Sequence, residues 1–398
     1  MNTSYISGKL FAPARLGRHT LRNRIIRAGC FEGMSRDGMV SAELIEHHRR
    51  IAQGGVAMTT VAYFAVSDDG RTFRDQLAAR PQVEHGLREL AWAVHKQGAL
   101  ASIQLVHAGF FADPKVIGGK PLGASPKYCA YHLTGCTEMT AAQIEEKVRA
   151  FADAAAMVKK AGFDAVEVHA GHGYLLSQFM SPWTNRRTDG YGGAIDNRMR
   201  FPAAVVTAVR QAAGSDMTVL VKMNVSDGFK AGLTPDDAVA AARQFEKAGA
   251  HCLVTSGGFT ARTPFYMLRG RLPVREMAAN QAHPAARLGL LLFGGLMVPR
   301  HRFTPMFFLE QARVIKDAVK IPVAYVGGAV SLESMNRTVG EGFGFIQLGR
   351  ATIRDPDIVT KMQGGGTVES DCDHCNRCVA AMDKGGVVCV SQKKGLLR

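Results

Sequence analysis

Residues 165–174 read AVEVHAGHGY, a β-branched apolar run that ends in two histidines separated by small residues. The run predicts a buried strand, because a short valine-rich stretch bounded by glycine is typical of one. An amphipathic helical pattern precedes it at 141–160, and another follows at 198–213. Strand and helix therefore alternate here, which is the pattern of a parallel sheet built from βα units.

The same alternation extends over most of the chain. Strands are predicted at 25–28, 56–61, 101–106, 165–169, 218–223, 252–256, 323–326 and 345–348. Amphipathic helices are predicted at 42–52, 83–96, 141–160, 198–213, 235–248, 306–318 and 332–340, with Asp236 and Ser331 near helix starts. The count predicts a closed (β/α)8 TIM barrel. A doubly wound open sheet is the alternative, and the count favours the barrel.

The connection after the sixth predicted strand is long, and residues 257–305 are interpreted as an insertion or lid. It contains LGLLLFGGLMV at 288–298, with arginines on both sides. Such a run is too short to span a bilayer. A helix buried against the barrel rim is predicted, and the wall of a substrate channel or a surface that contacts lipid are alternatives. The predicted domains are a barrel at 1–365 and a cysteine-rich segment at 366–398.

Composition limits the class of protein. The chain has 398 residues, 46% of them hydrophobic and 21% charged, as in ordinary globular proteins. The net charge of +15 comes from scattered basic residues, so no nucleic-acid partner is expected. The amino terminus has no secretory pattern, and a cytoplasmic location is expected. Four of the eight cysteines lie within 372–389, which indicates metal or redox chemistry rather than a disulfide framework.

His169, His172 and Tyr174 follow the fourth predicted strand, and the active site of a barrel lies at the carboxyl ends of its strands. The intervening glycines permit a tight turn that brings both imidazoles to one acceptor. Two N–H donors and a phenol suit the stabilisation of an enolate, in which charge grows on oxygen while a proton reaches carbon. Structural histidines and a zinc site are the alternatives. Glu167 is expected on the opposite strand face, which argues against zinc.

Glycine motifs follow the last two strands, as Gly-Gly at 327–328 and Gly-Arg at 349–350. Barrels often bind phosphate there through backbone N–H groups, and Arg350 adds positive charge. Gln104 lies near the end of the third strand, and Lys222 lies within the fifth, where a lysine needs an anionic partner. A phosphate-bearing cofactor with a ring that becomes negative on reduction would meet these needs. A salt bridge from Lys222 to a neighbouring acid is the alternative.

The sequence HAGHGYLLSQFMSP at 169–182, continued by NRRTDGYGG at 185–193, resembles the signature of the Old Yellow Enzyme flavoproteins, within the NADH:flavin oxidoreductase family. The resemblance extends over most of residues 8–360 and includes Phe11-Ala-Pro, Asn23-Arg24, Gln104-Leu-Val-His107 and both glycine motifs. The terminal cysteines are similar to those of the 2,4-dienoyl-CoA reductase branch. The further flavin and nicotinamide domains of that branch are not expected in this chain.

The resemblance implies a barrel that binds FMN non-covalently and is reduced by NADH or NADPH. The implied cofactor contacts are Ala28 and Ala62 beside the ring, Gln104 and Lys222 at its pyrimidine edge, and Gly328, Gly349 and Arg350 at the phosphate. His169 and His172 would bind the substrate's carbonyl oxygen, and Tyr174 would protonate its α-carbon. The implied activity is that of an ene-reductase for enones, enoates or enoyl thioesters.

Lys222 stands where several relatives carry an arginine on the fifth strand, so the positive charge is retained without the bidentate fork. The chain departs from the family pattern in two further places. Phe31 stands where relatives carry a threonine or cysteine that tunes the flavin, so Cys30 is not assigned that role. The second departure is the spacing C-x2-C-x2-C-x10-C, formed by Cys372, Cys375, Cys378 and Cys389 and shorter than in the dienoyl-CoA reductase branch. Four thiolates at this spacing are compatible with a [4Fe–4S] cluster or with zinc. Unmetallated thiols are the third alternative.

Two other functions compete with the ene-reductase. The same cofactor would serve an amine dehydrogenase or demethylase with a pocket shaped by the insertion. An electron-carrier subunit could instead dock to a partner or membrane through 288–298 and the cysteine segment. The expected partners are a small-molecule substrate and a second copy of the chain in a homo-oligomer.

Overall fold

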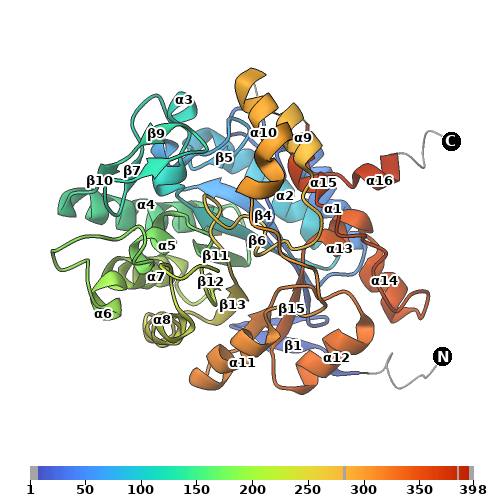
Figure 1. Ribbon diagram of the computed structural model, residues 1–398. Coiled ribbons are helices and arrows are strands. Elements are labelled where there is room, and N and C mark those ends of the chain that lie inside the picture. The colour runs from blue at the N-terminus through green and yellow to red at the C-terminus, as the bar shows by residue number, and fades with distance from the viewer. Residues whose placement is uncertain (1–7, 281–283, 383–384, 394–398) are drawn as a thin grey trace.

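The computed structural model describes residues 8–280, 284–382 and 385–393. Parallel strands form a closed barrel with helices around it (Figure 1). In order around the barrel, the eight strands are β3 (Ile25–Arg27), β4 (Met58–Ala65), β6 (Leu100–Val106), β11 (Ala165–Ala170), β12 (Thr218–Asn224), β13 (Cys252–Ser256), β14 (Val323–Tyr325) and β15 (Phe345–Leu348). Pairing of β15 with β3 and of β3 with β4 closes the ring. The predicted (β/α)8 TIM barrel is confirmed.

The helices that return the chain between strands lie outside the barrel. They are α1 (Ala42–Gln53), α2 (Glu84–His95), α4 (Ala141–Lys160), α7 (Arg200–Ala213), α8 (Pro235–Lys247), α11 (Leu309–Ala318) and α12 (Leu332–Gly340), with α13 (Arg350–Arg354) and α14 (Ile358–Gln363) after β15. Ser331 caps α12 as its position predicted, because its hydroxyl accepts the N–H of Ser334. Asp236 lies in the first turn of α8, and Thr234 is the residue that caps this helix.

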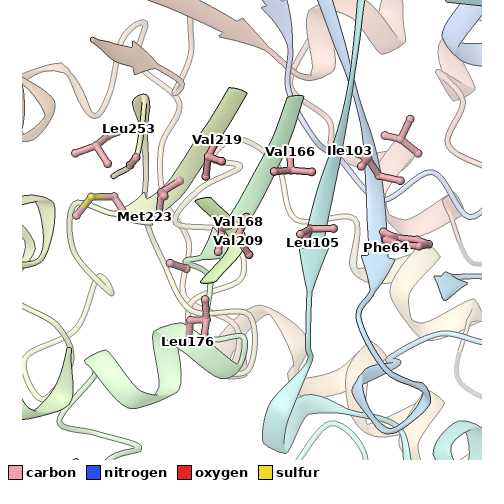
Figure 2. Packing of buried hydrophobic residues seen from close by; sticks show 14 of the residues in the cluster. Phe64, Ile103, Leu105, Val166, Val168, Leu176, Val209, Val219, Met223 and Leu253 are labelled. Atoms are coloured by element: carbon pink, nitrogen blue, oxygen red, sulfur yellow. The ribbon is translucent and has the colours of Figure 1, made fainter. Parts of the chain in front are cut away.

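Side chains alternate between the two faces of each strand, and each face has its own core. On the outer face, Val166 and Val168 of β11 belong to the same buried cluster as Val209 of α7 (Figure 2). A second cluster contains strand residues on the inward-facing register, including Ala165, Leu220, Val254, Ala324 and Phe345, together with residues of the hairpin β1 (Ala14–Leu16) and β2 (His19–Leu21). Apolar side chains therefore fill part of the interior and leave the strand ends for other chemistry.

Short elements are inserted between the barrel strands. They are η2 (Lys9–Phe11), η3 (Asp68–Gly70), β5 (Leu77–Ala78), η4 (Pro81–Val83), η5 (Gly109–Phe111), α3 (Pro114–Ile117), β7 (Leu122–Gly123), β8 (Tyr128–Cys129), β9 (Thr134–Gly135), β10 (Thr137–Glu138), α5 (Leu175–Met180) and α6 (Ile195–Arg198). Those between β6 and α4 form an excursion, residues 107–140, whose small strands pair only with one another. This excursion needs other contacts to hold it in place.

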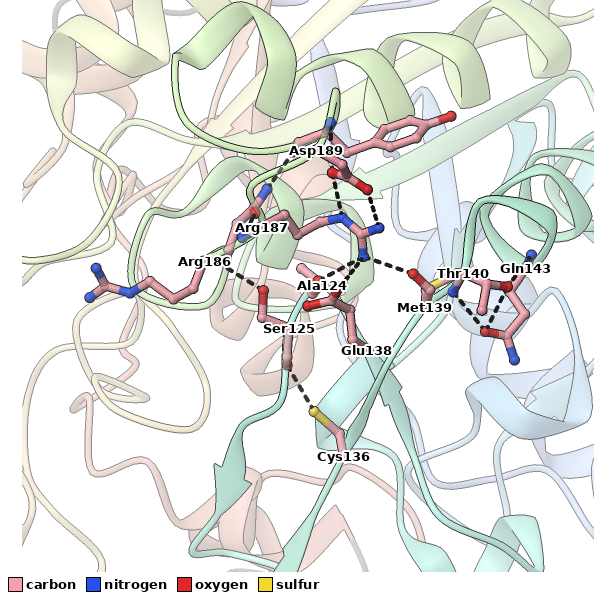
Figure 3. A network of polar contacts seen from close by, with 12 residues as sticks. Ala124, Ser125, Cys136, Glu138, Met139, Thr140, Gln143, Arg186, Arg187 and Asp189 are labelled. Atoms are coloured by element: carbon pink, nitrogen blue, oxygen red, sulfur yellow. Dashed lines mark hydrogen bonds and ion pairs between the residues drawn. The ribbon is translucent and has the colours of Figure 1, made fainter.

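Arg187 supplies several of those contacts (Figure 3). The buried guanidinium donates to the carbonyl oxygens of Ala124 and Met139 at 3.1 and 2.7 Å. It also forms a two-pronged ion pair with Asp189, through Nε at 3.0 Å and Nη2 at 2.6 Å. The Arg187–Asp189 part of the family-like motif therefore fastens the excursion to the barrel.

The insertion at 257–305 carries α9 (Val274–Ala279) and α10 (Pro284–Met297), which lie side by side at the edge of the molecule (Figure 1). The prediction that 288–298 is buried against the barrel rim is wrong. Leu292 is 63% exposed and Leu296 is 88% exposed. An apolar run favours a helix, but it does not specify what covers that helix. Among the described residues, no helix combines the length and the apolar character needed to cross a bilayer.

The cysteine-rich segment is tied to this insertion. It contains α15 (Arg377–Ala381) and α16 (Val390–Lys393). The Asn376 side chain donates to the carbonyl oxygens of Arg269 and Arg271 at 3.0 and 2.9 Å. Arg377 forms an ion pair with Glu276 of α9 at 2.7 Å. Residues about a hundred positions apart in the sequence thus form one interlocked surface layer.

We expect Arg187→Lys to lower the free energy of unfolding by about 2–3 kcal/mol, because an ammonium group cannot replace the planar fork that reaches Asp189 and two carbonyls at once. The neighbouring Arg186 is exposed, so Arg186→Lys is the matched control and should change stability by less than about 0.5 kcal/mol. Denaturant unfolding curves measure both values. Equal losses in the two variants would contradict the fastening role.

Candidate active site

His169, His172 and Tyr174 converge at the carboxyl end of β11. The His169 ring centroid lies 4.9 Å from that of His172 and 4.9 Å from that of Tyr174. The Tyr63 ring, at the end of β4, lies 5.4 Å from the Tyr174 ring. The structure therefore brings the three predicted catalytic residues together and adds a second tyrosine that the sequence reasoning did not select.

His169 has one nitrogen committed and one free. The N–H of Gly171 donates to Nδ1 of the imidazole at 3.3 Å. Nδ1 is therefore the acceptor, and Nε2 carries the hydrogen in the neutral ring. This Nε2 is buried and has no hydrogen-bond partner among the described residues. A buried donor without an acceptor is costly, and it marks the place where a ligand oxygen would be bound.

His172 is fixed in a turn with a left-handed backbone conformation, φ +59°. The side-chain oxygen of Asn224 accepts its N–H at 3.0 Å, and Thr260 donates twice to its carbonyl oxygen. Its Nε2 lies 2.7 Å from the hydroxyl of Ser256, at the end of β13. Gly173 is required next in the chain, because an added Cβ would lie 2.4 Å from the Phe259 ring.

Burial keeps all three side chains in their neutral forms. Burial and the nearby charge of Lys222 lower the pKa of His172 to about 3. Burial, with smaller contributions from His172 and Lys222, also holds the pKa of His169 well below its usual value. Burial raises the pKa of Tyr174 to about 12, although Tyr63 and Thr260 hydrogen-bond to it. The site at neutral pH therefore offers neutral imidazoles and a protonated phenol.

A polar layer inside the barrel lies beside the histidines and is centred on Glu167. Its carboxylate accepts from Gln104 at 2.6 Å, from Gln347 at 2.8 Å and from Lys222 at 2.9 Å. The expectation that Glu167 faces away from His169 is wrong, because residues two apart in a strand share a face. For Lys222, the predicted alternative of a salt bridge to a neighbouring acid is present in the structure.

The ends of β3 and β4 meet this layer. A Cβ added at Gly29 would lie 3.0 Å from the Gln104 amide and 3.4 Å from the Ala62 methyl group. Ala28 and Ala62 are both buried and carry only a methyl group as side chain. The Oε1 atoms of Gln104 and Gln347 are buried and have no partner among the described residues. This end of the barrel thus holds two acceptors and one donor that have no partner among the described residues.

A buried charged network that was not predicted from the sequence lies beside the ends of β3 and β4. The fully buried Arg27 donates to Glu32 at 2.7 Å, and the Glu32 carboxylate accepts the N–H of Ala62 at 3.0 Å. His48 of α1 lies 3.3 Å from the same carboxylate. The signal was available, since an arginine at an outward strand position demands an acid. The Phe31 ring stacks on the rings of Phe73 and Tyr63, with centroid distances of 4.3 and 5.6 Å.

Gly328 and Gly349 follow neighbouring strands, β14 and β15, as the phosphate prediction requires. The Arg350 side chain is already engaged in hydrogen bonds to neighbouring residues. Its guanidinium donates to Asn376 at 2.6 Å, to the Arg269 carbonyl at 3.1 Å and to the Leu268 carbonyl. Burial lowers its pKa. These contacts join Arg350 to the cysteine segment, and its phosphate role stays a prediction.

The four candidate metal ligands line one cavity of about 200 Å³, together with Arg350 and Arg354. They are Cys372, Cys375, Cys378 and Cys389. Among the described residues, no three potential ligands are placed to hold a metal ion. Burial raises the pKa of Cys378 to about 12, which favours a protonated thiol. The four cysteines thus share one cavity, and their role as metal ligands stays a prediction.

Comparison with known proteins places this geometry in a family. The sequence pattern of the NADH:flavin oxidoreductase / NADH oxidase family matches residues 9–257. A 4,4'-dithiodibutanoate disulfide reductase of Rhodococcus erythropolis is 40% identical over 377 residues, which are 94% of this chain and 93% of that protein. An NADH oxidase of Thermoanaerobacter brockii is 32% identical over 92% of this chain, and the chain spans 52% of its length.

Solved structures show the same fold. A 2-naphthoyl-CoA reductase complex has a TM-score of 0.79 at 24% identity, covering 93% of this chain and 54% of that one. An Old Yellow Enzyme homologue from Zymomonas mobilis has a TM-score of 0.72 at 20% identity, covering 92% and 95%. The chain belongs to the NADH:flavin oxidoreductase / NADH oxidase family, as its motifs predicted.

We expect the imidazoles of His169 and His172 to stay neutral between pH 5 and 8, since burial lowers both pKa values and His172 has a pKa of about 3. His95 is the internal control, because its hydrogen bond to Asp164 raises its pKa above 6.5. Histidine NMR spectra, assigned with single asparagine variants, should show His95 titrating in this range and the other two unchanged. A midpoint above pH 5 for either site histidine would contradict the neutral site.

Proposed function

We propose that the chain is an FMN-dependent NAD(P)H oxidoreductase that reduces the C=C bond of α,β-unsaturated carbonyl compounds. The unpartnered Nε2–H of His169, beside His172 and the protonated Tyr174, carries this proposal. It is a neutral donor set held in a buried site, which suits an oxygen atom that gains negative charge during the reaction. Residues 257–305, which follow β13 at the same end of the barrel, are proposed to cover the substrate.

The residues at the barrel mouth fit FMN. The free Oε1 atoms of Gln104 and Gln347 are acceptors suited to the N–H group of a pyrimidine ring, and Lys222 supplies a positive charge. The small residues Ala28 and Ala62 leave room for a flat ring. The glycines at 328 and 349 are proposed to bind the phosphate through their backbone, with Arg350 contributing charge.

When bound and reduced by NADH or NADPH, FMN would supply the hydride that the β-carbon of the substrate requires. The Nε2–H group of His169 would donate a hydrogen bond to the carbonyl oxygen and stabilise the charge that develops there. His172 is proposed as a second donor when the substrate oxygen replaces Ser256 as its partner. The Tyr174 hydroxyl gives its proton to the α-carbon and regains one from water. Its high pKa keeps the proton available at neutral pH.

This donor set favours a carbonyl substrate over an amine. An ammonium group needs acceptors or a carboxylate. The Glu167 carboxylate in this layer already accepts three hydrogen bonds, one of them from Lys222. The lowered pKa values of His169 and His172 also follow in part from the Lys222 charge, which would repel a cation. Among the described residues, the acceptors left for an amine are the Oε1 atoms of Gln104 and Gln347, which are proposed to contact FMN instead.

We expect Tyr174→Phe to slow reoxidation of the reduced enzyme by cyclohexenone about a hundredfold or more, because the α-carbon loses its acid. Reduction of the enzyme by NAD(P)H, which does not use this proton, should change little. Stopped-flow measurement of the two half-reactions separates these effects. Tyr128→Phe is the matched control, since it removes an exposed hydroxyl outside the site and leaves the hydrogen bond between Tyr63 and Tyr174 in place. Equal loss in both half-reactions would make Tyr174 structural.

Disulfide reduction is the second candidate, favoured by the 40% identity with the disulfide reductase over nearly the whole of both chains. A hydride would form a new S–H bond at one sulfur while the S–S bond breaks. The other sulfur would leave as a thiolate and take a proton. A thiolate is a stable leaving group, with a thiol pKa of about 8.5, so this reaction does not depend on a strong internal acid.

The two candidates therefore respond differently to the same substitution. If the chain reduces disulfides, wild-type protein should turn over 4,4'-dithiodibutanoate faster than cyclohexenone. Tyr174→Phe should then lower disulfide turnover by only a few-fold while it lowers enone turnover about a hundredfold. Steady-state NADH and NADPH consumption measures both rates. A disulfide rate below the enone rate would remove the second candidate, and the reverse order would make disulfide reduction the principal activity.

A further inference from the structure

The outward face of α10 exposes a group of large apolar side chains. Five large apolar side chains of this helix are about half exposed or more: Leu288 (57%), Leu291 (48%), Leu292 (63%), Phe293 (54%) and Leu296 (88%). The helix contacts α9 on its other side, where a Cβ added at Gly294 would lie 3.0 Å from Val274. Scattered apolar residues are normal on a surface, but a contiguous group marks a contact site.

The charge around this face has one sign. Arg287 lies within the first turn, and Arg300 and Arg302 follow the helix, all three exposed. No ion pair is formed by any of these arginines among the described residues. The sequence holds no aspartate or glutamate between Glu276 and Glu310. An apolar helix with arginines at both ends and no acidic residue of its own complements a surface that is apolar inside and negative outside.

We propose that α10 docks the protein on an anionic phospholipid surface, with its leucines among the acyl chains and its flanking arginines at the headgroups. The helix is too short to cross a bilayer, since fourteen residues extend only about 21 Å. It lies in the plane of the interface instead, as short basic-flanked apolar helices do. Each arginine near an anionic leaflet adds attraction that falls with rising salt.

A second copy of the chain is a poorer occupant. A two-fold contact along α10 would place the arginines of both copies around one apolar strip. The described part of this segment offers no carboxylate to neutralise them, and like charges at an interface disfavour association. The proposal concerns the exposed face of α10, opposite its contact with α9, and does not depend on the reaction assigned to the site.

Sedimentation with vesicles tests the proposal on the full chain. We expect the wild-type protein to sediment with vesicles of phosphatidylcholine and phosphatidylglycerol, and much less with phosphatidylcholine alone. Leu292→Glu/Leu296→Glu should lower the fraction bound about tenfold or more, because it places two charges in the acyl region. Arg287→Gln/Arg302→Gln keeps the apolar face and should selectively weaken binding to the anionic vesicles.

Trp92→Glu/Val314→Glu is the matched control. It replaces two exposed apolar residues on α2 and α11, 62% and 55% exposed, with the same two charges. Its vesicle binding should stay close to that of the wild type. Equal binding by the α10 variant, or no sedimentation of the wild type, overturns the proposal. A concentration-dependent dimer that only the α10 variant loses, without vesicle binding, overturns it in favour of a second copy. If the glutamate variant does not fold, the arginine pair decides.

Discussion

A carboxylate buried inside a barrel needs hydrogen-bond donors or a positive charge in direct contact with its oxygens. Glu167 is such a carboxylate in this fold. It takes donors from Gln104, Gln347 and Lys222, so four strands (β6, β11, β12 and β15) are joined through one group. Removal of any donor would leave a buried charge partly unsatisfied. The same arrangement orients both glutamine side chains and leaves their carbonyl oxygens free at the barrel mouth.

The chemistry of the mouth follows from the surroundings of that layer. The Lys222 charge adds to burial in keeping His169 and His172 neutral, and burial keeps Tyr174 protonated. Neutral donors in a site of this kind need little reorganisation when charge appears on a bound oxygen. The Arg27–Glu32 pair supports the side of the site formed by β3 and β4, because the Glu32 carboxylate accepts a hydrogen bond from the backbone N–H of Ala62. The two buried charge systems therefore hold the two sides of one site.

The sequence predicted the barrel because strands buried on both faces are short, β-branched and evenly spaced. The motif at the end of β11 also located the three catalytic candidates, since local glycines determine that turn. Features set by distant parts of the chain were not predictable. The orientation of the Arg350 side chain is set by hydrogen bonds to carbonyl oxygens some eighty residues away, in the insertion. The exposure of α10 depends on what surrounds it. Glu167 was misplaced through an error of strand periodicity, which the sequence itself could have corrected.

The contacts between the insertion and the cysteine segment have a consequence for building hybrid proteins. Asn376 and Arg377 are bonded to residues 269–276, and the backbone N–H of Val387 donates to the Glu32 carbonyl at 2.7 Å. The insertion and the cysteine segment are thus held together by polar contacts, and the cysteine segment is also hydrogen-bonded to the loop that follows Ala28. A graft of either segment from another barrel would meet mismatched partners unless its counterpart travelled with it. Their sequences should therefore be inherited, or engineered, as a pair.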